Sequence, residues 1–172
     1  MKSVLRTYGM PLIAGVVFVV LTVLSISVYW YQSRMVIDEV VVRDLSVLQK
    51  IFVDINNTCH ISGFDETINR VDFLNVGSFS GSELGAMNLY APQNWHGPYL
   101  DDNPTIQGIY YQIVKTKHGY FLTPGNGVRL TSGLVVGTDI VLNADSDVNE
   151  LIKSGKLRSR DGKPLAAAIS IE

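Results

Sequence analysis

A long run of apolar residues follows a short basic start. No charged residue occurs between Arg6 and Arg34, and the apolar stretch 10–31 is long enough to cross the ~30 Å hydrocarbon layer of a membrane as a helix. The stretch ends in the aromatic group 29–31, which is typical of a membrane interface. We therefore predict a basic leader at 1–9 and a transmembrane helix at 10–31.

The helical pattern continues after Arg34 with a different character. Apolar residues now recur every three or four positions, which places them on one face of a helix. These residues are Ile37, Val41, Leu45, Leu48, Phe52 and Ile55. Because no Pro or Gly interrupts 16–55, the pattern predicts one continuous helix about 65 Å long, with 32–56 as its amphipathic half. A separate short helix next to the membrane, packed on its own domain, is the alternative.

The remaining chain divides into two regions. Residues 57–107 are mixed and rich in Gly and Ser, with no sustained period, and we expect a connecting region with short helix or turn pieces. From 108 the pattern becomes typical of strands: β-branched and aromatic residues occupy 108–115 and 120–124, with a turn at His118-Gly119. One or two further strands are expected in 127–143. The region 108–172 should therefore be an antiparallel sheet.

A short helix is expected in this last region. Asp147 can act as its N-cap, Glu150 follows three residues later, and Gly155 suits its C-terminal end. The order of elements predicts an α+β fold in which a long N-terminal helix packs on a small antiparallel sheet.

Composition excludes several classes of function. The formal net charge is only −2, and the fourteen Lys and Arg residues are scattered, so we expect no nucleic-acid interface. A single cysteine, Cys59, permits neither an intrachain disulfide nor a cysteine-based zinc site. It precedes His60, but nothing in the sequence supplies an oriented base, and the three histidines lack metal-ligand spacing. We predict that the chain is not an enzyme.

One cluster of oxygen donors could bind a cation. Asp139, Asp145 and Asp147, together with Asn143, lie within nine residues, a composition that calcium sites use. Helix capping already accounts for Asp147, and no EF-hand pattern is present. We expect the chain to need no cofactor, with calcium at this cluster as the one candidate.

The segment "PQNWHGPYL" at 92–100 combines aromatic rings with a constrained backbone. Pro98 fixes its own φ and biases Gly97 towards an extended conformation, while Trp95 and Tyr99 offer large apolar surfaces to cover a sheet. Together with Leu100, these residues resemble the Trp-x-Gly-Pro-Tyr-Leu segment of major pseudopilins of type II secretion systems. The resemblance implies a docking corner and the pilin-like order of long helix followed by sheet. The family also binds calcium in a loop of its sheet region.

The resemblance also gives the N-terminus a role. Pilins and pseudopilins carry a short basic leader that ends in Gly, and prepilin peptidase would then cleave between Gly9 and Met10 and methylate the new N-terminus. The usual glutamate five residues after the cleavage point is replaced by Ala14. This departure resembles atypical tip subunits.

The family implies a structural subunit of a type II secretion pseudopilus or type IV filament, active in protein transport or filament assembly. Its partners would be other pilin or pseudopilin subunits, prepilin peptidase and an inner-membrane assembly platform. It would cross the bacterial inner membrane once, with a cytoplasmic N-terminus and a periplasmic or filament-borne domain. An uncleaved, membrane-anchored periplasmic scaffold or binding protein with a pilin-like domain is the alternative.

Overall fold

The computed structural model describes the backbone of residues 2–171 and the side chains of residues 14–28 and 37–171. The chain forms two compact units, Met1–Val36 and Ile37–Glu172. Helix α1 (Lys2–Cys59) begins in the first unit and ends in the second.

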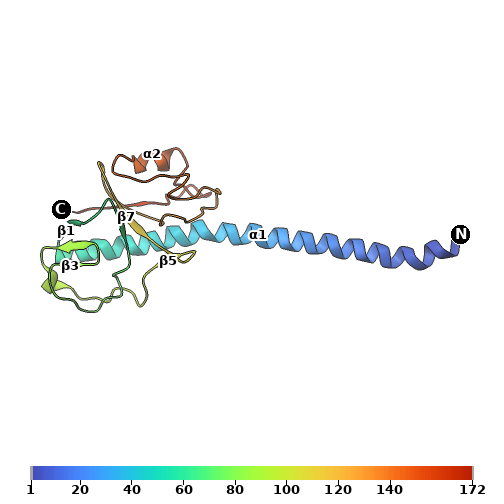
Figure 1. Ribbon diagram of the computed structural model, residues 1–172, viewed down its shortest axis with the longest axis horizontal. Helices are drawn as coiled ribbons and strands as arrows, with labels where there is room; N and C mark the ends of the chain where they lie inside the picture. Colours follow the sequence, from blue (N-terminus) through green and yellow to red (C-terminus); the bar gives the residue numbers. More distant parts are fainter. Residues whose placement is uncertain (1, 172) are drawn as a thin grey trace. The chain divides into compact units, whose positions relative to one another are not determined.

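The second unit is α+β with small antiparallel sheets, as the sequence predicts (Figure 1). Three sheets are present in the described chain, with strand orders β1-β4-β3, β2-β7-β8-β9 and β5-β6. The strands are β1 (Ile61–Phe64), β2 (Ile68–Arg70), β3 (Glu83–Leu84), β4 (Met87–Leu89), β5 (Thr105–Ile106), β6 (Ile109–Tyr110), β7 (Gln112–Thr116), β8 (Gly119–Thr123) and β9 (Ala167–Ile169).

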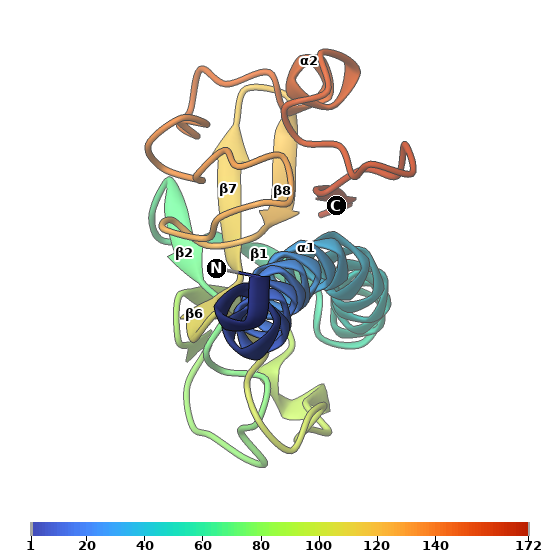
Figure 2. The ribbon, with the colours of Figure 1, turned by 90° about the vertical axis from the view of Figure 1, so that its right-hand side faces the viewer.

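The hairpin predicted from 108 onward is confirmed in its main part. Strands β7 and β8 pair antiparallel from Gln112↔Thr123 to Thr116↔Gly119, and they lie at the centre of the four-stranded sheet (Figure 2). Residues 109–110 do not extend β7, because they form the separate strand β6, which pairs with β5. The expected single strand is therefore two strands in different sheets.

Two regions differ from the sequence expectation. Segment 57–107 is not only a connection: it contains β1 to β5 and the 3₁₀ turn Pro92–Asn94. Segment 127–143, where further strands were expected, has only isolated bridges, Arg129↔Val135 and Val136↔Ile140. Its glycines allow tight turns, such as the one at Gly137 with a φ of +86°, and these turns interrupt the pattern before a ladder forms.

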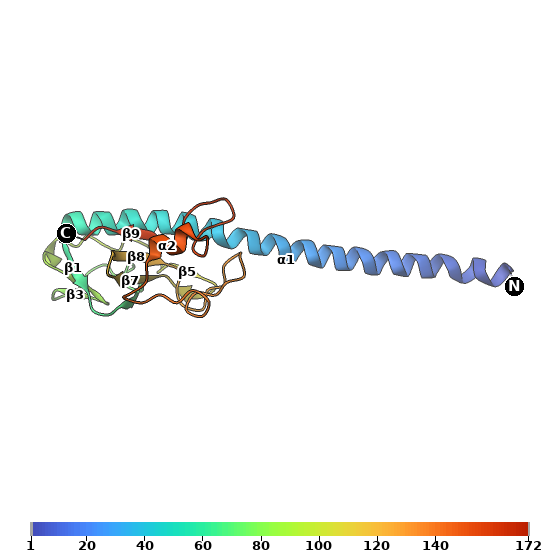
Figure 3. The same cartoon turned by 90° about the horizontal axis from the view of Figure 1, so that it is seen from above.

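The amphipathic half of α1 packs as predicted from Ile37 onward, while the side chains of its first residues, 32–36, lie outside the described part of the chain (Figure 3). Ile37 is half-buried, and the other five residues of the predicted face, Val41, Leu45, Leu48, Phe52 and Ile55, are no more than 3% exposed. The Phe52 ring contacts the rings of Phe64 and Phe73 edge to face, at centroid distances of 6.4 and 6.3 Å. This face of α1 and the sheets therefore share one hydrophobic core.

The short helix is also confirmed. Helix α2 (Val148–Lys153) begins after Asp147, whose side chain accepts a 3.0 Å hydrogen bond from the backbone N–H of Glu150. Gly155 follows its C-terminal end with a φ of +85°, a conformation that favours glycine.

Candidate functional site

Trp95 is the anchor of the predicted docking corner. Its indole N–H donates a 3.0 Å hydrogen bond to the backbone carbonyl of Val76. Its ring meets Phe79 and Tyr99 edge to face, at centroid distances of 5.6 and 4.9 Å. Trp95 and Tyr99 are half-buried against the hydrophobic core, and the Phe79 contact also joins the corner to the loop 74–79. The corner stabilises a loop, with the edge-to-face geometry that aromatic pairs prefer.

The backbone of the corner is fitted closely to the same loop. The N–H groups of Tyr99 and Leu100 both donate to the carbonyl of Leu74, at 2.9 and 3.2 Å. A Cβ atom on Gly97 would lie 2.6 Å from the Val76 carbonyl oxygen, closer than any side chain tolerates. The peptide bond between Gly97 and Pro98 is cis. Gly97 is thus required by space, whereas the sequence suggested only a conformational role.

The corner is also joined to the end of α1. The amide of Asn94 donates a 2.9 Å hydrogen bond to the carbonyl of Thr58, and His96 Nε2 lies 3.2 Å from Asp54 Oδ2. Tyr99 lies beside this contact, and burial raises the pKa of its hydroxyl to about 12. The segment 92–100 therefore connects the C-terminal turn of α1 to the loop 74–79, which makes it a structural joint.

The apolar pattern of α1 did not indicate a role for two of its acidic side chains, Asp38 and Asp44. Asp38 is only 4% exposed, and its carboxylate accepts a 3.0 Å hydrogen bond from the backbone N–H of Thr131. Asp44 accepts a 3.0 Å hydrogen bond from the hydroxyl of the fully buried Tyr111. Burial and the adjacent Asp44 carboxylate raise the pKa of Tyr111 above its usual range. These bonds fix α1 against the sheet region.

The proposed calcium ligands are not gathered into one site. Asp139 accepts a hydrogen bond from the Val135 N–H at 2.8 Å, and Asp147 caps α2. Asp145 pairs with the Lys117 ammonium at 2.6 Å, and this hydrogen bond lowers the pKa of the carboxyl. Among the residues described by the structure, no group of three or more His, Cys, Asp or Glu side chains could hold a metal ion. Turn formation, capping and a surface ion pair account for the acidic cluster.

The N-terminal unit contains the predicted processing site. Gly9 and Met10 lie outside the residues whose side chains the structure describes. All residues from 14 to 28 are exposed, including Ala14 and the large apolar side chains that follow it. Within the described residues, no helix combines the length and hydropathy needed for a membrane span.

No protein-family model, curated protein or solved structure matches this chain.

Proposed function

We propose that the protein is a structural, non-enzymatic subunit of a type II secretion pseudopilus or type IV filament. The observation that carries this proposal is the segment 14–28 of α1, whose apolar side chains are exposed on every side. A helix that is apolar all round needs an apolar environment, either lipid or a bundle of similar helices. A pilin-like subunit meets both environments, the lipid membrane before assembly and the bundle of helices in the filament afterwards.

The polar side chains of this segment support the same environment. The hydroxyls of Thr22, Ser25 and Ser27 each donate a 2.8 Å hydrogen bond to the carbonyl four residues earlier. An unpaired hydroxyl is costly in hydrocarbon, and this local bond removes the cost without help from a neighbour. The segment thus presents no unsatisfied side-chain donor among the residues described.

The second unit has the features of a domain carried by such a helix. The face of α1 that begins at Ile37 is buried against small antiparallel sheets, and the segment 92–100 joins the helix end to a loop. The resemblance to pseudopilins implies the same organisation, in which the C-terminal half of a long helix packs on a small antiparallel sheet. The proposal includes a pilin-like fold and a transmembrane helix at 10–31. It also includes an inner-membrane location and the partners that the family implies.

Ala14 bears on the position that the proposed subunit would take in a filament. In filament models of the family, the usual glutamate pairs with the N-terminus of a neighbouring subunit. A chain with Ala14 brings no such charge into the apolar core, so it needs no partner there. We therefore favour a minor, tip-like subunit. The same replacement favours the second candidate, an uncleaved anchored scaffold or binding protein, because that role requires no filament core.

Intact mass of the full-length protein from native membranes tests the proposal. With active prepilin peptidase we expect loss of residues 1–9 and gain of one methyl group at Met10. The uncut mass is expected without the peptidase, and also for Gly9→Val, which alters the residue at the cleavage point. An uncut wild-type chain in the presence of active peptidase would reject the filament role and support the anchored scaffold.

A further inference from the structure

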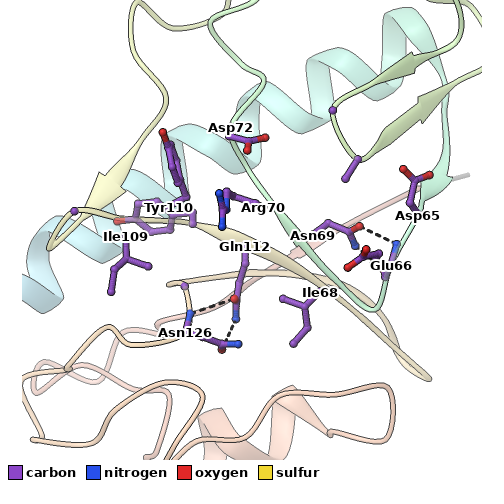
Figure 4. A pocket seen from close by; sticks show the side chains of 15 residues that line it. Asp65, Glu66, Ile68, Asn69, Arg70, Asp72, Ile109, Tyr110, Gln112 and Asn126 are labelled. Carbon is purple, nitrogen blue, oxygen red and sulfur yellow. Dashed lines mark hydrogen bonds between the residues drawn. The ribbon is translucent and has the colours of Figure 1, made fainter.

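A pocket of about 840 Å³ lies along β2, at one edge of the four-stranded sheet (Figure 4). Its walls come from β2 and its flanking residues, from the turn Gly85–Ala86, from β6 and from Asn126. The corner 92–100 and the apolar segment 14–28 contribute no residue to its lining. Its size is in the range of sites that bind small ligands or side chains of a partner.

The β2 wall of the pocket has backbone N–H and C=O groups that form no hydrogen bond to another described strand. Val71 N–H donates to Tyr111 and Lys115 N–H donates to Thr67, at 2.9 and 2.8 Å, which fixes the side of β2 that pairs with β7. Backbone groups alternate between the two sides of an antiparallel strand. The N–H and C=O groups of Ile68 and Arg70 therefore point to the open edge, where no described strand pairs with them.

The charge of the pocket is negative. Asp65, Glu66 and Asp72 supply three carboxylates, whereas Arg70 is the only basic residue in the lining that the structure describes. The Arg70 guanidinium lies 5.5 Å from the centre of the Tyr110 ring. Neither Glu66 nor Asp72 forms an ion pair with another described residue. The pocket thus combines free carboxylates with free carbonyl groups, which favours ammonium or guanidinium groups.

The same molecule carries a surface of opposite charge. Segment 156–164 forms a tight hairpin, with an antiparallel bridge between Arg158 and Pro164 and a 2.8 Å hydrogen bond from Ser159 N–H to the Lys163 carbonyl. Its exposed basic residues are Lys156, Arg158, Arg160 and Lys163, against one acidic residue, Asp161. We call this segment the basic hairpin. It leads directly into β9, the strand at the opposite edge of the sheet from β2.

We propose that the basic hairpin of one copy occupies the β2 pocket of a second copy. Charge complementarity selects this occupant, because the pocket is net negative and the hairpin is strongly basic. The two surfaces lie at opposite edges of one sheet, so each copy gives its hairpin to one neighbour and its pocket to another. Such a heterologous contact closes into a ring if the rotation between copies allows it, and otherwise it extends along an open filament. The inference rests on the proposed filament function and adds the contact between its domains.

Charge reversal in the full-length protein in detergent solution tests this contact. Glu66→Lys with Asp72→Lys reverses the pocket, and Lys156→Glu with Arg158→Glu reverses the hairpin. Each double variant alone should associate about tenfold more weakly than wild type, measured by sedimentation at low salt. An equimolar mixture of the two should regain the lost affinity, because each reversed surface then finds its complement. Association of wild type should also weaken as salt is added.

The matched control reverses two acidic residues elsewhere. Asp101 and Asp102 are exposed and do not line the pocket, so changing both to Lys should leave association unchanged. The proposal is overturned if the mixture associates no better than its components, or if the control weakens association equally. A peptide of residues 156–164 should compete with association. Equal competition by a scrambled peptide would mean that the pocket takes any basic peptide, and would overturn the assignment to a second copy.

The two proposals fail in different ways. If prepilin peptidase processes the chain but charge reversal leaves association intact, the filament function stands and the contact is wrong. If the chain stays uncut while the mixture of reversed variants recovers association, the contact stands and the filament function is wrong.

Discussion

The Tyr111 hydroxyl donates a 3.0 Å hydrogen bond to the Asp44 carboxylate across 67 residues of sequence. It joins the amphipathic half of α1 to the residue that precedes β7. Tyr111 is fully buried, and Asp44 retains only partial access to water, with 22% of its side chain exposed. The bond therefore connects helix and sheet through a largely desolvated polar contact.

Removing this hydroxyl should destabilise the second unit. Tyr111→Phe keeps the ring but leaves the Asp44 carboxylate without that donor, which should lower the free energy of unfolding by about 1–3 kcal/mol. Urea unfolding of the full-length protein in detergent measures the change. Tyr110→Phe is the control, because the Tyr110 hydroxyl makes no hydrogen bond to the described residues. An equal effect of both substitutions would contradict the role of the Asp44 bond.

The docking corner should depend on both the ring and the N–H group of Trp95. Trp95→Ala removes the contacts with Phe79 and Tyr99 and should destabilise the protein by about 2–4 kcal/mol, since the ring is only half-buried. Trp95→Phe keeps a ring and loses the bond to Val76, at a cost of about 1 kcal/mol. We expect incorporation into filaments to fall in the same order. Wild-type stability in the Ala variant would contradict the docking role.

A side chain at position 97 should be poorly tolerated. In Gly97→Ala the new methyl would meet the Val76 carbonyl at 2.6 Å and the Trp95 indole nitrogen at 2.7 Å, so the corner must move. We expect a loss of about 1–3 kcal/mol in unfolding free energy. Gly77→Ala provides the comparison on the facing loop, because its methyl would meet only Pro98 Cδ at an ordinary 3.7 Å. Thermal unfolding of both variants should separate them clearly; equal melting temperatures would show that the corner is not tightly packed.

The sequence predicted local features better than distant ones. The spacing of Val41 to Ile55 located the buried face of α1, because a helix places such residues together whatever the rest of the chain does. Strands of two residues, such as β3 and β5, are too short to show alternation. Asp38 and Thr131 meet across 93 residues, and no local pattern records that contact. The anchoring role of Trp95 followed from its motif, but its partners in the loop 74–79 did not.

Alkaline pH should reveal the burial of Tyr99. Burial raises the pKa of its hydroxyl from 10.0 to about 12, so between these values the unfolded chain loses this proton while the folded chain keeps it. The stabilising contribution is present below pH 10 and is lost as pH rises towards 12. Urea unfolding across this range should show a steeper decline for wild type than for Tyr99→Phe. Tyr90→Phe, at a side chain that is 75% exposed, should decline like wild type.

The carboxylate of Asp38 should matter as an acceptor for the loop that contains Thr131. Asp38→Ala leaves the Thr131 N–H without this acceptor in a region where Asp38 is only 4% exposed, and should cost about 1–3 kcal/mol. Asp38→Asn keeps a side-chain oxygen in nearly the same place and should recover much of that loss. Hydrogen exchange of the Thr131 amide provides a local measurement: it should accelerate in the Ala variant and remain slow in the Asn variant. Equal exchange in both variants would show that another contact, and not the side chain of Asp38, protects this amide.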